Sequence, residues 1–125
     1  MDRTFILVGV GGLTGSILRY LIATFFARQA ASGFPYGTLV VNLVGCFLIG
    51  VLFALSEKGE LLSPEWRILL TTGFCGGFTT FSAFSYESVQ MLQDGQMLTA
   101  LLYVGTSVIV GLALTYAGML LVKAM

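Results

Sequence analysis

The residues with the clearest capacity for chemistry lie in one short stretch, GFCGGFTTFSAF, at positions 73–84. Each glycine in this stretch lowers the helix propensity by about 1 kcal/mol relative to alanine. The hydroxyls of Thr79 and Thr80 are placed to satisfy backbone groups that an interrupted helix sets free. Backbone carbonyls at such an interruption suit a hard cation such as sodium, and a second copy of the chain would add further oxygens. The stretch therefore predicts an interrupted helix with a capacity to bind ions.

The same stretch carries phenylalanines at helical spacing. Phe78, Phe81 and Phe84 follow one another at intervals of i, i+3, which predicts a single aromatic stripe. Such a stripe usually packs against lipid or a neighbouring helix. Because the edge of an aromatic ring carries partial positive charge, the rings are also suited to face an anion. Both interpretations remain open from the residues alone.

Polar side chains elsewhere repeat a second spacing. Thr38 and Asn42 are four residues apart, as are Tyr103 and Ser107, so each pair shares one face of its helix. Asparagine and hydroxyl groups in an apolar helix commonly bond a neighbouring helix or their own backbone. The alternative is that Thr38 and Asn42 line one polar track.

Two charged residues lie inside the apolar sequence. Arg19 is well inside the first apolar stretch, and Glu87 lies towards the end of the third. The arginine is expected to extend to the membrane interface, to pair with an acid or to draw anions towards a vestibule. The glutamate is interpreted either as an interfacial residue or as a carboxylate of an ion vestibule.

The elements that position these residues follow from composition. The chain has 125 residues, of which 57% are hydrophobic and 10% charged, against about 25% charged in a soluble domain. Four stretches reach the length of about 20 apolar residues that a membrane-spanning helix needs. We therefore expect one all-α transmembrane domain over residues 1–125, with spans at 5–27, 36–55, 67–92 and 97–122.

Other residue types argue against several classes of protein. The sequence has no histidine, and Cys46 and Cys75 lie in apolar stretches without metal-ligand spacing. Hydrolytic and transition-metal enzymes are therefore disfavoured, and we expect no enzymatic activity. The net charge is +0 and no basic cluster occurs, which argues against a nucleic-acid partner.

Small residues predict how the helices meet. Gly11 and Gly15 form a GxxxG pair, and so do Gly73 and Gly77. Such pairs allow helix backbones to approach closely in lipid. Four short helices leave little room for an aqueous path inside one chain, so we expect an oligomer.

Taken together, these motifs resemble those of the Fluc (CrcB) family of fluoride channels, and the resemblance covers nearly the whole chain. GGLTGSILRY (11–20) is similar to the first-helix motif of the family, and TLVVNLVGCFLIG (38–50) to its second-helix motif. The stretch at 73–84 resembles the third-helix signature closely. Phe78 stands where an aliphatic residue is common, and Ala83 where a threonine is common.

The resemblance implies a homodimer of antiparallel subunits with dual topology and two fluoride pores along the subunit interface. The third helix would be broken at mid-membrane, and the two breaks would meet at the dimer centre. There the backbone carbonyls of Gly76 and Thr79 from each chain would hold a structural sodium ion. Phe81 and Phe84 would present their ring edges to fluoride near Asn42.

The resemblance extends to other polar residues. Tyr103 and Ser107 match the polar track of the fourth helix, and Thr38 would belong to the same pore. Arg19 and Glu87 match positions near the vestibules. Lysines and arginines are somewhat more numerous on the side of the termini than dual insertion favours.

These expectations favour a passive fluoride channel of the bacterial inner membrane that exports fluoride and gives fluoride resistance. A secondary transporter is the alternative, either a proton-coupled fluoride exchanger or a small multidrug exporter. The multidrug exporters need a carboxylate deep in the first helix, where this chain has Arg19. A third interpretation is a non-transporting membrane subunit whose polar residues only join helices.

Overall fold

Each apolar stretch of the sequence forms a helical segment long enough to cross a membrane. A computed structural model describes residues 3–29, 33–59 and 61–125. The segments have sufficient length and hydropathy over α1 (Thr4–Gln29), α2 (Tyr36–Glu57), the third segment (Pro64–Gln93) and α6 (Met97–Lys123). The prediction of an all-α membrane protein with four spanning helices is confirmed for the described residues.

The third segment is built from several pieces. Ser63 caps its start, because the Ser63 side chain accepts a hydrogen bond from the Trp66 N–H at 3.3 Å and proline follows at the first helical position. The pieces are α3 (Pro64–Ile68), the π-helical segment η1 (Leu69–Cys75), α4 (Gly76–Phe78) and α5 (Phe81–Gln93).

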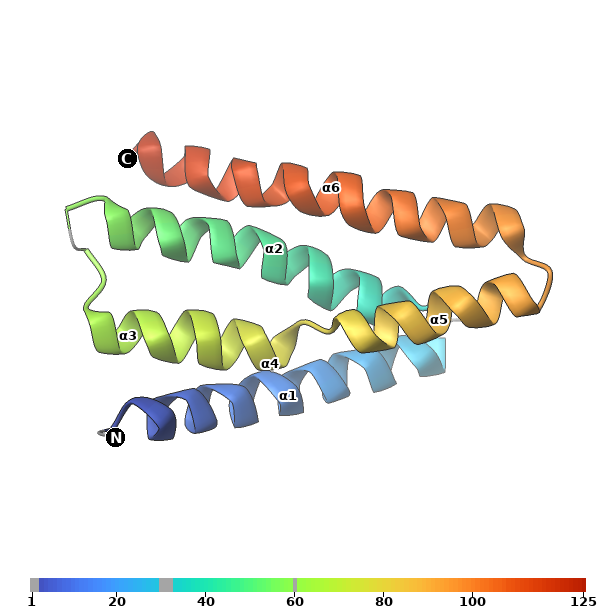
Figure 1. Ribbon diagram of the computed structural model, residues 1–125, viewed down its shortest axis with the longest axis horizontal. Helices are drawn as coiled ribbons and strands as arrows, with labels where there is room; N and C mark the ends of the chain where they lie inside the picture. The colour runs from blue at the N-terminus through green and yellow to red at the C-terminus, as the bar shows by residue number, and fades with distance from the viewer. Residues whose placement is uncertain (1–2, 30–32, 60) are drawn as a thin grey trace.

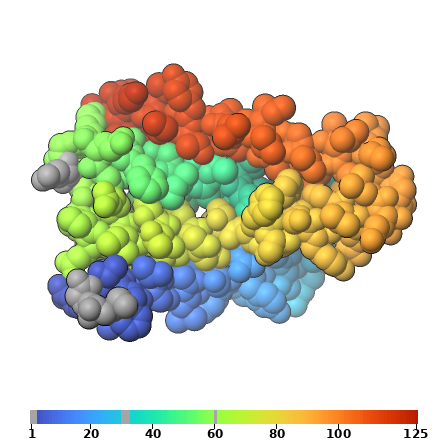
Figure 2. Space-filling model, viewed as in Figure 1, coloured from blue at the N-terminus to red at the C-terminus, as the bar shows by residue number. Residues whose placement is uncertain are grey.

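The four segments run side by side along the longest axis of the molecule. Both ends of the chain lie at one end of the bundle, together with the connection from α2 to α3 (Figure 1). The connection from α5 to α6 lies at the opposite end. In the space-filling view, α1 and α6 form the two edges of the bundle, with α2 and the third segment between them (Figure 2).

The two GxxxG pairs predicted to mediate close packing do so, and they meet each other. A Cβ atom on Gly11 would lie 2.4 Å from the carbonyl oxygen of Leu69, and one on Gly15 would lie 2.2 Å from that of Phe74. From the third segment, in turn, a Cβ on Gly77 would lie 2.5 Å from the carbonyl oxygen of Gly12 on α1. We call this contact between α1 and the residues of η1 and α4 the glycine seam. It leaves no room for a side chain at these positions and fixes the third segment against α1.

A second close contact joins α2 to α6. A Cβ on Gly50 would lie 2.1 Å from the carbonyl oxygen of Thr115, and one on Gly118 would lie 2.5 Å from that of Phe47. The Thr115 hydroxyl also donates a hydrogen bond to the carbonyl of Cys46 at 2.9 Å. This contact holds the polar residues of α2 and α6 in a fixed register.

Candidate functional site

Two extended residues separate α4 from α5 in the third segment. The α4 helix ends at Phe78, and α5 begins at Phe81. Between them Thr79 has φ −93° and ψ 160°, and Thr80 has φ −152° and ψ 119°. These angles lie in the extended region, so the backbone groups around the two threonines cannot all keep helical partners.

The side-chain amide of Asn42, on α2, bonds both backbone groups of Thr80. The Asn42 Nδ2 group donates to the Thr80 carbonyl at 3.0 Å, and the Thr80 N–H donates to Asn42 Oδ1 at 2.8 Å. The Thr80 hydroxyl in turn accepts a hydrogen bond from the Ala83 N–H at 3.1 Å and caps α5. The side chain of Asn42 therefore holds the extended backbone in place.

These contacts deprive two carbonyl oxygens of the donors that a continuous helix would give them. The helical donor to Gly76 is the N–H of Thr80, which is bonded to Asn42. The helical donor to Thr79 is the N–H of Ala83, which is bonded to the Thr80 hydroxyl. The carbonyls of Gly76 and Thr79, the two residues implied as sodium ligands, are therefore among those that lose their helical donors.

Arg19 lies at the same place on the opposite side of the third segment. Its Nε–H donates to the carbonyl of Gly77 at 2.9 Å. The structure thus places the guanidinium group across the glycine seam, in contact with backbone rather than with an acid. Sequence reasoning did not identify Gly77 as its partner, because the spacing of residues within α1 carries no information about a carbonyl on another helix.

A groove of about 420 Å³ opens beside the extended residues. It is lined by most of the residues predicted for the fluoride pathway and by both predicted sodium ligands, namely Asn42, Gly76, Thr79, Phe81, Phe84 and Ser107. The Ser107 hydroxyl is buried and has no hydrogen-bond partner among the described residues. The groove therefore combines aromatic rings, an amide, a hydroxyl and carbonyl oxygens on one side of the chain.

The prediction of a single aromatic stripe is wrong for Phe78. This ring is buried, at 3% exposure, and stacks on Phe74 with a centroid distance of 5.4 Å. Phe81 is 78% exposed and lines the groove with Phe84, with ring centroids 5.7 Å apart. The extended residues between α4 and α5 change the helical phase, so spacing of three residues across them does not keep two rings on one face.

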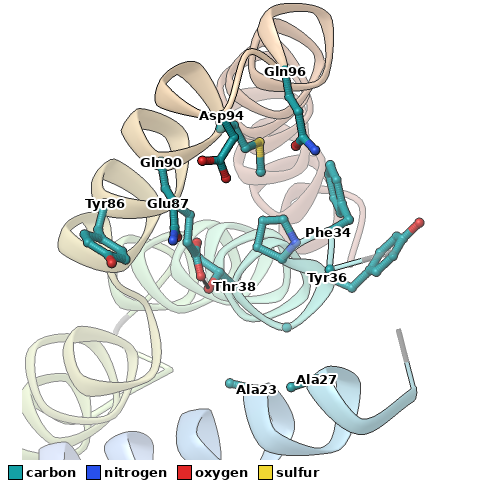
Figure 3. Close-up of a pocket in the computed structure, with 14 residues that line it drawn as sticks. Ala23, Ala27, Phe34, Tyr36, Thr38, Tyr86, Glu87, Gln90, Asp94 and Gln96 are labelled. Atoms are coloured by element: carbon teal, nitrogen blue, oxygen red, sulfur yellow. Dashed lines mark hydrogen bonds between the residues drawn. The ribbon is translucent and has the colours of Figure 1, made fainter. Parts of the chain in front are cut away.

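A separate cavity of about 550 Å³ lies near the connections at the far end of α5 (Figure 3). Thr38 and Glu87 line it, and Tyr103 is buried beside them. The Thr38 hydroxyl donates to Glu87 Oε2 at 2.8 Å, and the Tyr103 hydroxyl donates to Glu87 Oε1 at 2.8 Å. We call this cavity the outer cavity and these three residues the carboxylate cluster.

The carboxylate cluster adjoins the groove. The ring of Tyr103 lies 5.1 Å from that of Phe84, which lines the groove. Neither Thr38 nor Tyr103 lines the groove, although Asn42 and Ser107, each four residues further along the same helices, do. Sequence reasoning placed Glu87 near a vestibule but did not pair it with Thr38 and Tyr103, because that pairing depends on how three helices align.

Sequence comparison places the chain among known proteins. The family model for CrcB-like protein, Camphor Resistance (CrcB), matches residues 6–119. A protein of Leptospira interrogans named fluoride-specific ion channel FluC is 46% identical over 122 residues, which cover 98% of this chain and 96% of the relative. Proteins of the same name from Chlorobaculum tepidum and Rhizobium meliloti are 50% and 45% identical, covering 97% and 96% of this chain and 95% and 96% of the relatives. The chain belongs to the CrcB family.

Proposed function

We propose that this chain is a fluoride-specific ion channel that lets fluoride cross a membrane passively, down its electrochemical gradient. The observation that carries the proposal is the 45–50% identity to proteins named as fluoride-specific channels over nearly the full length of the chain. The groove beside Thr79 and Thr80 supports it, because its lining offers donors to an anion. A channel of this kind makes and breaks no covalent bonds, so the protein is not an enzyme.

The groove offers groups that can replace the water around a small anion. Fluoride binds water tightly, and a pore must compensate for that water with fixed donors. The Asn42 amide carries two N–H donors, of which one bonds the Thr80 carbonyl and the other is available to fluoride. Phe81 and Phe84 add the positive edges of their rings, and the Ser107 hydroxyl adds a donor.

The functional unit of the proposal is a homodimer of two antiparallel copies inserted with dual topology. In a lone chain the groove would leave Asn42, the released carbonyls and Phe81 at its open side. Backbone groups without partners do not persist in contact with lipid and must be covered by protein or water. A second copy in the opposite orientation covers the groove and brings the two pairs of extended residues together at mid-membrane.

A sodium ion at the dimer centre would be held by the carbonyls of Gly76 and Thr79 from both copies. The donor set fits a hard cation, because the extended backbone releases these two oxygens from helical bonding. The ion would neutralise carbonyl dipoles that face one another across the interface. Replacing sodium by potassium or N-methylglucamine in the purification buffer is expected to lower the dimer fraction, measured by single-molecule photobleaching in liposomes.

The proposed location is the cytoplasmic membrane of a bacterium, where the channel would give resistance to fluoride. Fluoride enters an acidified cell as neutral HF and dissociates inside. The anion then leaves through the channel along its gradient. The four spanning helices and the bacterial origin of the named relatives support this location.

A liposome assay tests the transport proposal. Purified protein is reconstituted, and efflux is followed with a fluoride electrode and, in a parallel sample, a chloride electrode. We expect rapid fluoride efflux without a proton gradient, a fluoride current in planar bilayers and no chloride efflux. Flux that depends on a proton gradient would identify an exchanger, and the absence of any flux would identify a non-transporting subunit.

Substitution of the rings tests the pathway. Phe81→Ile and Phe84→Ile are each expected to abolish fluoride efflux, because isoleucine has no ring edge to face the anion. Phe5→Ile is the matched control, since Phe5 lies on α1 away from the groove and is 60% exposed. Size-exclusion profiles check that all variants fold. Undiminished efflux from both groove variants would remove the rings from the pathway.

A further inference from the structure

The outer cavity and the groove have no lining residue in common, although α2 and α5 line both. On α2, Thr38 lines the outer cavity and Asn42 lines the groove. On α5, Glu87 lines the outer cavity and Phe84 lines the groove. Tyr103, one helical turn before Ser107 on α6, is buried between them, at 1% exposure. The carboxylate cluster therefore lies between the two spaces.

The negatively charged carboxylate of Glu87 occupies the hydroxyl donors that lie between the two spaces. Each carboxylate oxygen accepts one hydroxyl hydrogen bond, from Thr38 and from Tyr103, both at 2.8 Å. Hydroxyl donors of this kind are what a dehydrated small anion requires. The two carboxylate oxygens therefore stand where a permeating anion would be bound, and their charge repels a second anion.

From this geometry we propose that Glu87 is a gate, a tethered anion that competes with the permeating ion for the hydroxyls of Thr38 and Tyr103. The proposal rests on the proposed fluoride channel function and adds a control point to it. Fluoride passes between the outer cavity and the groove only when it displaces the carboxylate from the two hydroxyls. The carboxylate returns to them when the ion has left.

The outer cavity has space and donors for the displaced carboxylate. Gln90 lies one turn beyond Glu87 on α5, and Gln96 lines the same cavity; both carry amide N–H donors (Figure 3). Asp94 lines this cavity too, and its negative charge opposes a second carboxylate there. The displaced position is therefore accessible but electrostatically disfavoured, which returns Glu87 to the hydroxyls. A side chain with two such positions can respond to the fluoride concentration.

The test measures fluoride current in planar bilayers as a function of fluoride concentration, with purified full-length protein. Glu87→Ala removes the competitor and leaves both hydroxyls. We expect the fluoride concentration that gives half-maximal current to fall at least threefold. Glu87→Gln keeps the shape of the side chain without its charge, and its amide oxygen replaces only part of the acceptor capacity. It is expected to shift the same quantity in the same direction by a smaller factor.

The control is Glu65→Ala, which removes a carboxylate from the start of α3 at the opposite end of the bundle and is expected to leave the half-maximal concentration unchanged (Figure 1). A purely structural role for Glu87 predicts fewer folded channels or a lower maximal current at an unchanged half-maximal concentration. That result in the Gln variant would overturn the gate while leaving the channel intact. If the wild-type protein carries no fluoride current, the proposed function fails, and the gate with it.

Discussion

Gly76 and Gly77 are neighbours in the sequence, but they face opposite surroundings. A Cβ on Gly77 would lie 2.5 Å from the carbonyl oxygen of Gly12, inside the glycine seam. A Cβ on Gly76 would meet nothing within 4 Å, because it points into the groove. One side of the third segment is therefore closed by its own chain, and the other is open. The difference separates the part of the chain that is complete by itself from the part that, in our proposal, a second copy completes.

The largest effect is expected in the glycine seam. Gly15→Ala places a methyl group 2.2 Å from the carbonyl oxygen of Phe74, and neither backbone can move without separating α1 from the third segment. Overpacking of this kind costs about 1–3 kcal/mol of unfolding free energy, and a clash of backbone with backbone places this variant at the upper end. The thermal unfolding midpoint in detergent should fall sharply, or the variant should fail to yield monodisperse protein. A normal midpoint would show that the seam can open.

Gly76→Ala sharpens the comparison from the open side. The lone chain has space for the added methyl group, so the thermal unfolding midpoint of the chain in detergent should change little. In liposomes the dimer dissociation constant should rise tenfold or more, because the methyl group would occupy space that the second copy needs. Photobleaching steps counted over a dilution series measure this constant. An unaltered constant would place the dimer contact elsewhere.

Asn42→Ala tests whether the Asn42 amide holds the extended backbone at Thr80 in place. The substitution leaves the Thr80 N–H without its acceptor and the Thr80 carbonyl without the amide donor. We expect a loss of about 1–3 kcal/mol in unfolding free energy and a lower fluoride efflux rate. Ser56→Ala is the control, since among the described residues the Ser56 hydroxyl bonds only the carbonyl of Leu52 within its own helix. Equal stability of the two variants would contradict a clamping role for Asn42.

The smallest effect is expected at Gly9. This residue is exposed within α1, and an added Cβ would meet nothing within 4 Å. Gly9→Ala should therefore leave efflux unchanged and raise stability by about 0.5–1 kcal/mol through helix propensity alone. Together with Gly15→Ala it compares two glycines of one helix. A large loss of stability at Gly9 would mean that this face of α1 is covered in the assembly.

Much of the fold could be predicted because it follows from periodic and compositional signals. Hydropathy located the spanning segments, and GxxxG spacing indicated four of the glycines that meet a neighbouring backbone. The third segment, expected from residue 67, begins at Pro64 with Ser63 as its cap. Signals of this kind are local, so a single sequence carries them.

The partners of the polar residues could not be predicted in the same way. The bonds from Arg19 to Gly77 and from Tyr103 to Glu87 depend on how helices align along their axes. That alignment is decided by glycine contacts and packing far from the polar groups. The position of Phe78 was missed for a related reason, because the exact extent of the non-helical residues decides which rings share a face. The candidate site was therefore predicted as a set of residues rather than as an arrangement.

The two extended threonines place the C-terminal end of one helix next to the N-terminal end of another, so that helix ends of opposite polarity are neighbours. The helical run that stops at Phe78 finishes with carbonyl oxygens, and the run that starts at Phe81 opens with amide hydrogens. Partial negative and partial positive charge thus lie within a few residues, without any ionised side chain of the third segment at that point. One short piece of backbone can in this way attract ions of either sign, each to its own side.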